Sequence, residues 1–249
     1  MPELYDVREE YQFPAAVSAK VQFCGYIRRE VDPESGDTLR QQLGIFKTDR
    51  MILVTAGGGE DGYGLMRAYI EGLSHHSADS SIKSVIVTGP ELAELHTREI
   101  KHLAERCPYA GVIEFTDQMM NYINAADVVV SMAGYNTICE ILSLRKRSVI
   151  VPRVEPVQEQ KIRAERMARL GLFTMIHPRD LTPYSLIRAV HREAEALWES
   201  PSAPATLAMD ALPRITAVVR ELVGYEPGGP TRQFTRLGSN GHAESVVHR

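Results

Sequence analysis

The chain has no hydrophobic run long enough to cross a membrane. None of its 249 residues belongs to an apolar stretch of the roughly 18 to 20 residues that a membrane-spanning helix requires. Residues 1–10 are polar and acidic, and they lack the apolar centre of a signal peptide. We therefore predict a protein without a membrane span, located in the cytoplasm. Membrane association would then be peripheral and would depend on a partner.

Cysteine is also scarce. Cys24, Cys107 and Cys139 are odd in number and far apart, which argues against both a disulfide framework and a Cys-x-x-Cys metal site. We predict that all three are reduced. The histidines have no spacing that would bring them together on a metal, so no metal site is expected.

Positive charge is not in excess. The 28 Lys and Arg residues are outnumbered by 32 Asp and Glu residues, which gives a formal net charge of −4. A nucleic-acid-binding domain usually carries a basic excess or a basic face, so this function is not expected. With 44% hydrophobic residues, the chain can bury a full core. The length allows one large domain or about one and a half ordinary ones.

Predicted strands and helices alternate along the chain, a pattern typical of a doubly wound parallel sheet of the Rossmann-like α/β class. In such a sheet, ligands bind beyond the carboxyl ends of the strands. The predicted strands are residues 21–26, 51–55, 84–88, 112–115, 128–131 and 148–151. The predicted helices are residues 37–43, 63–73, 91–105, 118–124, 137–144, 159–170, 181–199 and 206–223, the last broken or kinked at Pro213.

The most informative segment runs from Phe115 to Glu140. Residues 128–130 are three consecutive valines, which indicates a strand covered on both faces. Gly134 then turns the chain, and Asn136 or Thr137 is expected to cap the helix that follows. The free N–H groups and the positive dipole end of that helix would bind an anion such as a diphosphate.

A glycine run after the predicted strand 51–55 allows several interpretations. Gly57, Gly59 and Gly62 match the spacing of the dinucleotide fingerprint, but the next strand ends without the acidic residue that would hold a ribose hydroxyl. A Walker loop is excluded because Leu65 and Met66 stand where Lys and Ser or Thr would be needed. A nicotinamide or flavin site and a tight turn without a ligand both stay open.

Four blocks of sequence resemble one family. They are Phe115-Thr-Asp-Gln-Met, Ala-Asp127-Val-Val-Val-Ser, Ala-Gly134-Tyr-Asn-Thr-Ile-Cys-Glu140, and Ile-Val-Pro152 through Gln158-Glu-Gln160. In these residues and their spacing the chain is similar to the carboxy-terminal domain of MurG-type GT-B glycosyltransferases, the family 28 C-terminal domain. The resemblance covers about residues 21–172. It implies one half of a GT-B fold that binds a UDP-sugar, with UDP-N-acetylglucosamine the expected donor.

The resemblance also implies roles for individual residues. Backbone groups of Phe115 and Thr116 would pair with uracil, and Glu140 would accept hydrogen bonds from the ribose hydroxyls. Arg29 would lie near the nucleotide, although Arg28 could serve instead. The remaining expected contacts are to the diphosphate, from Gly58, Gly59, Gly134, Asn136 and Thr137, and to the sugar, from Gln160 and Gln158.

The chain departs from the family pattern in two respects. Glu60 and Asp61 follow the glycines where the family usually has a serine or threonine, and two carboxylates would repel a diphosphate unless they point away or bind a cation. The acceptor site and the catalytic base belong to the family's amino-terminal domain, which this sequence lacks, so no catalytic residue is predicted here. We expect a truncated frame or one subunit of a split enzyme.

The implied organisation has four parts. Residues 1–20 read as an interdomain linker, residues 21–200 as the UDP-sugar-binding domain, residues 201–224 as a helix that returns to the missing domain, and residues 225–249 as a disordered tail. No cofactor beyond the donor substrate is expected, and the expected partner is an amino-terminal-domain chain or a second copy. A sugar-nucleotide epimerase and a non-catalytic nucleotide-sugar-binding module are the alternative functions.

Overall fold

The computed structural model describes residues 1–75, 81–196, 207–224, 236–237 and 243–244. The chain divides into two compact units, residues 1–211 and 212–249. The second unit contains most of helix α10 (Ala211–Leu222) and the antiparallel pair β7 (Arg236–Leu237) and β8 (Ala243–Glu244). The rest of the tail predicted to be disordered lies outside the described residues. The first unit holds the large sheet.

That sheet has six strands, all parallel, in the order β3-β2-β1-β4-β5-β6. This is the strand order of a Rossmann-like doubly wound sheet, so the predicted fold class is confirmed. The strands are β1 (Arg50–Thr55), β2 (Ile82–Val87), β3 (Ala110–Ile113), β4 (Val128–Ser131), β5 (Arg147–Ile150) and β6 (Thr174–Met175).

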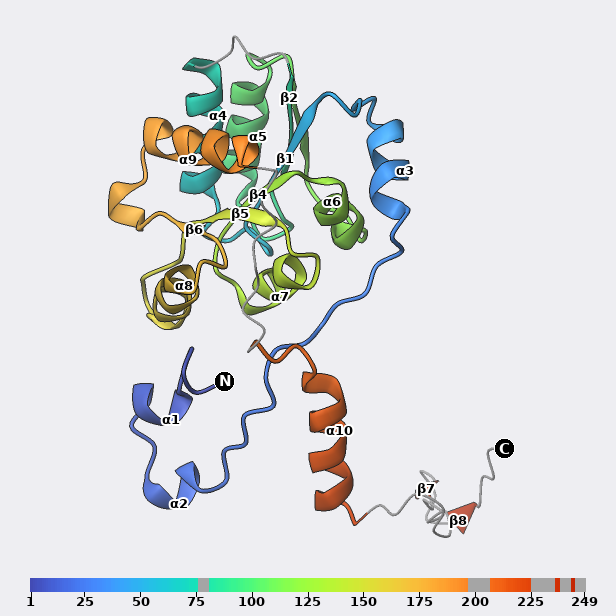
Figure 1. Cartoon of the computed structure of the whole chain (residues 1–249), viewed down its shortest axis with the longest axis vertical. Helices are drawn as coiled ribbons and strands as arrows, with labels where there is room; N and C mark the ends of the chain where they lie inside the picture. Colours follow the sequence, from blue (N-terminus) through green and yellow to red (C-terminus); the bar gives the residue numbers. More distant parts are fainter. Residues whose placement is uncertain (76–80, 197–206, 225–235, 238–242, 245–249) are drawn as a thin grey trace. The chain divides into compact units, whose positions relative to one another are not determined.

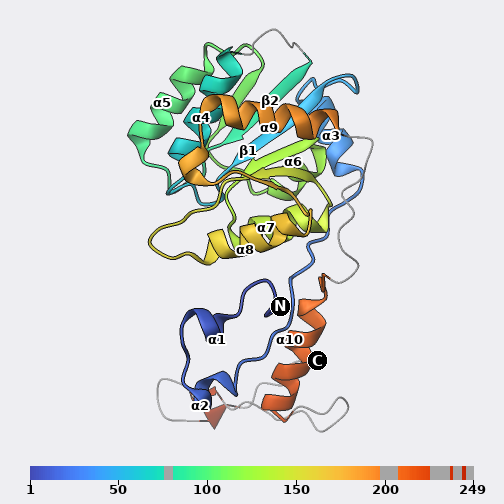
Figure 2. The same cartoon turned by 60° about the vertical axis from the view of Figure 1, so that its left-hand side comes forward.

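Helices cover both faces of the sheet (Figures 1 and 2). One face packs against α4 (Tyr63–His75), α5 (Glu94–Ala104) and α9 (Pro183–Glu195), whose buried side chains include Tyr69, Ile100 and Ile187. The opposite face packs against α3 (Ser35–Gln42), α6 (Met119–Ala125), α7 (Tyr135–Ser143) and α8 (Glu159–Arg169).

Strand β4 shows why the valine run forms a central strand. Val128 and Val130 lie in the core under α4 and α9, whereas Val129 lies in the core under α6 and α7. All three are fully buried. Successive residues of a strand point to opposite faces, so a strand with helices on both sides needs apolar residues at every position. The predicted strand 128–131 is confirmed.

The predicted strand 21–26 is wrong. The segment has no strand, and the nearby Ile27 makes only an isolated antiparallel bridge with Asp210. The backbone N–H of Tyr26 donates to the carbonyl of Ala208 at 2.8 Å, so this segment pairs with the end of the first unit and not with the sheet. Tyr26 is the residue of this segment that is buried in the core, whereas Val21, Phe23 and Cys24 are only partly buried.

Residues 1–20 belong to the same compact unit as the sheet and contain two short helices, α1 (Val7–Glu10) and α2 (Ala15–Ser18), neither of which has a buried residue. Leu4 is 2% exposed, and its carbonyl accepts a hydrogen bond from Arg166 of α8. Leu4 thus gives the segment a contact with the core, and the interdomain linker expected there stays a prediction.

Several predicted boundaries differ from the observed ones. Helix α7 begins at Tyr135 with Gly134 as its N-cap, so neither Asn136 nor Thr137 caps it. Pro213 is the third residue of α10 and neither breaks nor kinks the helix, because a proline in the first turn removes no intrahelical hydrogen bond. The two-residue strand β6, the 3-10 helix η1 (Pro178–Asp180), and the short elements α1, α2, β7 and β8 had not been expected.

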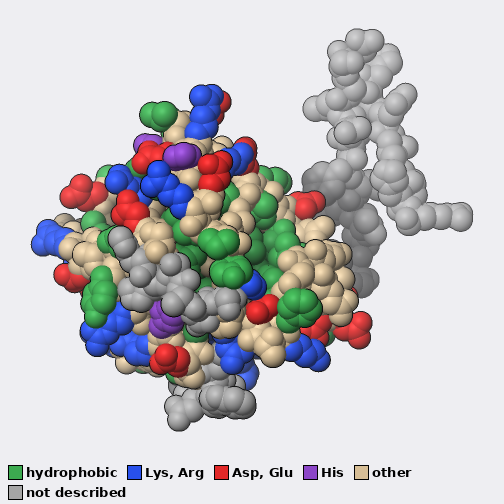
Figure 3. Space-filling view, turned by 90° about the horizontal axis from the view of Figure 1, so that it is seen from above, with side chains coloured by type: hydrophobic (Ala, Val, Ile, Leu, Met, Phe, Trp, Pro, Cys, Tyr) green, Lys and Arg blue, Asp and Glu red, His purple; other side chains and the backbone are tan. Residues whose placement is uncertain are grey.

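Basic and acidic side chains are interspersed on the face seen in Figure 3, where neither sign gathers into a patch. That face has no field of a single sign such as a nucleic-acid surface presents. Within the described residues, no helix is both long and apolar enough to span a membrane. All three cysteines are free, as predicted, and burial raises the pKa of the Cys107 and Cys139 thiols.

Candidate nucleotide-sugar site

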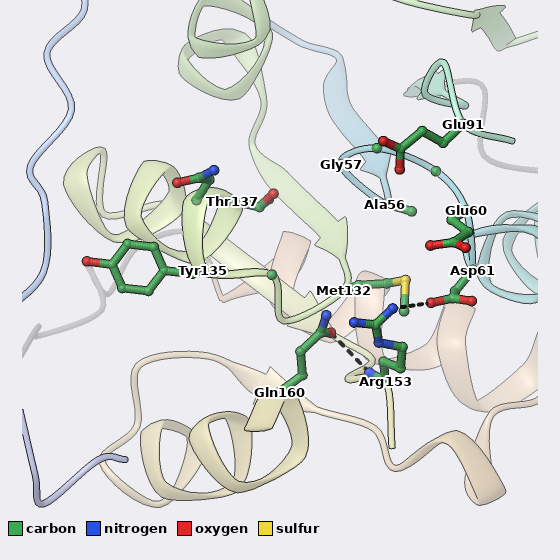
Figure 4. A pocket seen from close by; sticks show the side chains of 14 residues that line it. Ala56, Gly57, Glu60, Asp61, Glu91, Met132, Tyr135, Thr137, Arg153 and Gln160 are labelled. Atoms are coloured by element: carbon green, nitrogen blue, oxygen red, sulfur yellow. Dashed lines mark hydrogen bonds and ion pairs between the residues drawn. The ribbon is translucent and has the colours of Figure 1, made fainter. Parts of the chain in front are cut away.

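A pocket of about 440 Å³ opens beyond the carboxyl ends of β1, β4 and β5 (Figure 4). The loops that follow these strands bring together glycines, the start of α7 and several charged side chains. The lining residues are Ala56, Gly57, Gly58, Gly59, Glu60, Asp61, Glu91, Met132, Gly134, Tyr135, Asn136, Thr137, Arg153 and Gln160. This is the position at which doubly wound folds bind ligands.

The glycine loop between β1 and α4 is packed tightly against the next loop. A Cβ on Gly59, whose φ is +101°, would overlap the carbonyl oxygen of Thr88, and a Cβ on Gly58 would overlap the carboxylate of Glu91. The backbone N–H of Glu91 donates to the carbonyl of Gly58 at 2.8 Å. The glycines therefore have a packing function. The backbone N–H groups of Gly58 and Gly59 have no hydrogen-bond partner in the described chain.

The start of α7 forms the opposite wall. The first helical backbone bond runs from Ile138 N–H to the carbonyl of Gly134, so the N–H groups of Tyr135, Asn136 and Thr137 have no partner among the described residues. Thr137 Oγ1 lies 3.5 Å from the position that a Cβ on Gly57 would occupy, which places the two loops side by side. Free N–H groups and the positive dipole end of a nine-residue helix favour an anion here.

Charged side chains surround the far end of the pocket. Arg153 Nη1 donates to Asp61 Oδ2 at 2.8 Å, and the side chains are 37% and 44% exposed. An ion pair as exposed as this contributes only about 0–1 kcal/mol to the free energy of unfolding. Glu60 and Glu91 also reach the pocket (Figure 4). Within the described chain, these carboxylates form no metal-binding group.

Gln160 is oriented by the backbone. Its Oε1 accepts a hydrogen bond from the N–H of Arg153 at 3.1 Å, the second dashed line in Figure 4. Because the oxygen is used in this way, the amide nitrogen of Gln160 is left as a donor toward the pocket. A hydroxyl or a phosphate oxygen could accept from it.

A buried arginine supports the turn before α7. Arg163 is 3% exposed, its Nη2 donates to the carbonyl of Ala133 at 3.1 Å, and its Nη1 lies 2.9 Å from Glu159 Oε1. Its guanidinium lies over the ring of Tyr135, which stacks on Tyr26 and points away from the pocket (Figure 4). The turn that presents the free N–H groups therefore rests on a buried guanidinium and two aromatic rings.

Glu140 lies one turn further along α7, on the side of Asn136 and Thr137. Burial raises the pKa of the Glu140 carboxyl above its ordinary value, and the Arg29 guanidinium lowers it in part. The backbone N–H of Arg29 donates to Ser143 Oγ at 2.8 Å, which fixes this residue beside α7. A half-buried carboxylate at this position can accept hydrogen bonds from hydroxyl groups.

Phe115 and Thr116 follow β3 at the same edge of the sheet. The N–H groups of Thr88 and Gly89 bond to the carbonyls of Ile113 and Glu114, which extends the pairing of β2 and β3 as far as Glu114. Beyond it, in the described chain, the backbone N–H and carbonyl groups of Phe115 and Thr116 have no partner. Alternating donors and acceptors of this kind can pair with the edge of a pyrimidine.

Comparison with known proteins agrees with this geometry. The model of the glycosyltransferase family 28 C-terminal domain matches residues 51–206, more than half of the chain. The chain belongs to this family. The resemblance seen in the sequence is thus confirmed.

Curated relatives of this family 28 domain are longer than the chain. It is 26% identical over 203 residues to an uncharacterized glycosyltransferase of Methanopyrus kandleri, covering 81% of the chain and 54% of the relative. It is 28% identical over 185 residues to the UDP-N-acetylglucosamine–N-acetylmuramyl-(pentapeptide) pyrophosphoryl-undecaprenol N-acetylglucosamine transferase of Clostridioides difficile, covering 73% of the chain and 44% of the relative. The chain therefore spans about half the length of the curated relatives it matches.

Solved structures share the fold. The MurG of Acinetobacter baumannii superposes with a TM-score of 0.58 at 16% identity, covering 70% of this chain and 53% of that one. A glycosyltransferase of Rickettsia africae superposes with a TM-score of 0.64 at 11% identity, covering 88% of this chain and 61% of that one. The family 28 domain described here therefore has the fold of one half of such enzymes.

The structure divides the residues expected to bind the ligand into three sets. Six of them line the pocket together, namely Gly58, Gly59, Gly134, Asn136, Thr137 and Gln160. Four others lie outside the pocket lining. Glu140 is on α7, Arg29 lies beside α7, and Phe115 and Thr116 follow β3. Gln158 is exposed at the N-cap of α8 and its side chain makes no capping bond.

Sequence reasoning missed two arginines. Arg153 lines the pocket and Arg163 supports the turn. Arg153 had a usable signal, because it follows the strand at residues 148–151 directly at its carboxyl end, where loops bind ligands. Arg163 had none, since an arginine inside a polar helix normally faces solvent.

Proposed function

We propose that this chain is the donor-binding domain of a glycosyltransferase and that it binds a UDP-sugar, with UDP-N-acetylglucosamine the best-supported donor. One observation carries the proposal. In a family 28 domain, the free N–H groups at the start of α7 and those of the glycine loop face one pocket at the carboxyl edge of the sheet. Such an arrangement stabilises a diphosphate.

The nucleotide would lie along this edge. Uracil would pair with the backbone of Phe115 and Thr116, whose groups are free to do so, and the ribose hydroxyls would donate to Glu140. The diphosphate would then reach Asn136, Thr137 and the glycine loop. The bound nucleotide would therefore run from the end of β3, past the start of α7, to the glycine loop after β1. Its sugar would lie at the end of the pocket formed by Gln160.

In transfer, this domain would act on the leaving group. As the bond between the sugar and the diphosphate breaks, negative charge grows on the departing UDP, and fixed N–H groups at a helix end stabilise that charge without having to reorganise. The base that deprotonates the acceptor hydroxyl would come from a second domain or a partner chain. This proposed function needs no cofactor beyond the donor substrate, and a cytoplasmic location stays a prediction.

Thermal unfolding of the purified chain with a panel of nucleotides tests this function. UDP or a UDP-sugar at about 100 times its dissociation constant should add roughly 2.7 kcal/mol to the free energy of unfolding. For a chain of this length that raises Tm by several degrees. GDP-mannose and NAD at the same concentration should raise it less.

The variant Glu140→Ala separates specific from general binding. It should lose most of the shift with UDP, because the ribose then lacks its acceptor. A panel in which NAD shifts Tm more than UDP does would contradict the proposed donor. Equal shifts for the wild-type chain and the variant would contradict the proposed orientation.

A further inference from the structure

We propose that Arg153 binds the β-phosphate of the donor, and that Asp61 competes with the nucleotide for this arginine and so sets the affinity for the diphosphate. The inference rests on the proposed function and adds two residues to it. Neither belongs to the helix end or to the glycine backbone. They form an ion pair across the far end of the pocket (Figure 4).

The charge of the lining requires such a residue. Glu60, Asp61 and Glu91 contribute three carboxylates, and Arg153 contributes the one cationic side chain among the pocket-lining residues that the structure describes. Carboxylates repel a diphosphate strongly at short range, more so where the protein excludes water. The N–H groups of α7 and of the glycine loop would have to overcome this repulsion unaided. Arg153 offsets it at the end of the pocket where the carboxylates lie.

Arg153 also has donors to spare. Its Nη1 is used by Asp61, whereas its Nε is buried without a hydrogen-bond partner in the described chain. An orphaned buried N–H is unfavourable, and a ligand oxygen would satisfy it once the side chain turns from Asp61 toward the pocket. A guanidinium offers two parallel N–H groups to a phosphate, a geometry that a lysine cannot reproduce.

Position along the pocket selects the β-phosphate. The proposed nucleotide enters from Phe115 and Glu140, so its α-phosphate meets the start of α7 first. Arg153 lies next to Gln160, whose Oε1 bonds to its backbone, at the opposite end. UDP reaches that end through its second phosphate, and UMP does not.

The ion pair between Asp61 and Arg153 can be broken by an incoming phosphate. Both partners of the pair are more than a third exposed, so the pair is weakly held and an incoming phosphate can replace the carboxylate. The same carboxylate repels that phosphate. Asp61 therefore weakens the binding of every diphosphate ligand, and its removal strengthens it.

Calorimetric titration of UDP and UMP into the whole chain and its variants, at one fixed low salt concentration, tests the inference. For Arg153→Gln, UDP should bind about tenfold more weakly and UMP within about twofold of the wild-type chain. Arg153→Lys should fall between the two, since it keeps the charge and loses the fork. Asp61→Asn should bind UDP severalfold more tightly.

A matched control removes the same charge elsewhere. Arg98 pairs with Glu94 on the exposed surface of α5, so Arg98→Gln should leave both affinities unchanged. Tm without ligand should be similar for Arg153→Gln and the wild-type chain, because Asp61 is left partly exposed and can be hydrated.

The outcomes separate this inference from the function on which it rests. A wild-type chain that binds neither UDP nor a UDP-sugar would overturn both. A wild-type chain that binds UDP, together with Arg153→Gln that loses UDP and UMP equally or loses neither, would overturn only the role of Arg153. An unchanged UDP affinity in Asp61→Asn would overturn the competition by Asp61.

Discussion

Gly59 has the most demanding backbone position in the pocket. Its φ of +101° is strained for any side chain, and an added Cβ would overlap the carbonyl oxygen of Thr88. We expect Gly59→Ala to lower the free energy of unfolding by at least about 1–3 kcal/mol, the usual cost of such strain. Urea denaturation measures this change.

Gly64 offers a matched control on the same stretch of chain. It lies in the first turn of α4, and a Cβ there would meet nothing within 4 Å. Gly64→Ala should leave stability unchanged or raise it by up to about 1 kcal/mol, because alanine is the better helix former. Equal losses in the two variants would show that the packing of the two loops is not what requires Gly59.

The Glu140 carboxylate is expected to lower the stability of the folded chain at neutral pH while it contributes to UDP binding. Because its pKa is raised in the folded chain, the folded state holds its proton more firmly than the unfolded state, and stability falls as pH rises from the ordinary value of 4.5 through the folded value. Glu140→Gln removes this loss. The variant should therefore be more stable than the wild-type chain at neutral pH, and the difference should vanish below the ordinary value.

The same substitution should weaken UDP binding, since a neutral amide accepts weaker hydrogen bonds from ribose hydroxyls than a carboxylate does. Thermal unfolding across a pH series, with and without UDP, records both effects. A variant that is less stable than the wild-type chain at neutral pH would contradict the raised pKa of the Glu140 carboxyl, and one that binds UDP as well as the wild-type chain would show that Glu140 does not bind the ribose.

The turn from β4 into α7 depends on a residue from another helix. Arg163 of α8 is the donor to the Ala133 carbonyl, and its carboxylate partner Glu159 is 40% exposed. In Arg163→Met the partly exposed Glu159 can be hydrated, but the carbonyl loses its donor, which costs about 1–3 kcal/mol. We also expect weaker UDP binding, because the turn is less firmly held.

Arg169→Met makes the same change at the exposed end of α8 and should stay within about 0.5 kcal/mol of the wild-type chain. Urea denaturation and a UDP titration of both variants test the comparison. Loss of stability in Arg163→Met with full UDP affinity would mean that the turn keeps its geometry without the arginine.

The elements that could be predicted from the sequence are those in which the local residue pattern matches the burial that the fold imposes. The valines of β4 are buried on both faces, so their pattern was sufficient. The predicted strand 21–26 was wrong because the backbone of Tyr26 pairs with Ala208 and Ala211, a contact with no local signal in the sequence, while its side chain is buried in the core. The start of α7 was misplaced because Gly134 caps the helix without a side chain.

The residues that line the pocket differ in the same way in how far the sequence predicted them. Gly134, Asn136 and Thr137 line the pocket, and the sequence indicated them because a glycine turn between a buried strand and a helix lies within one short segment. Arg153 and Asp61 were not paired beforehand, because 92 residues separate them and only the fold brings them together. Contacts between loops of different strands are set by the sheet order, which the sequence alone did not give.

The whole chain consists of two units, and the pocket belongs to the first. A chain ending at Ala211 keeps the backbone pairing of Tyr26 with Ala208 and with Ala211 itself. We expect it to unfold cooperatively and to bind UDP with the affinity of the full chain, as measured by calorimetry. Loss of UDP binding on this truncation would mean that residues after Ala211 contribute to the site.

The central claim is that UDP binds along the carboxyl edge of the sheet. A crystal structure of the chain with UDP tests it most directly. We predict uracil against the backbone of Phe115 and Thr116, ribose on Glu140, and the diphosphate between the start of α7 and the glycine loop. Crystals that contain UDP at any other place, or none at a concentration that saturates binding in solution, would contradict the account.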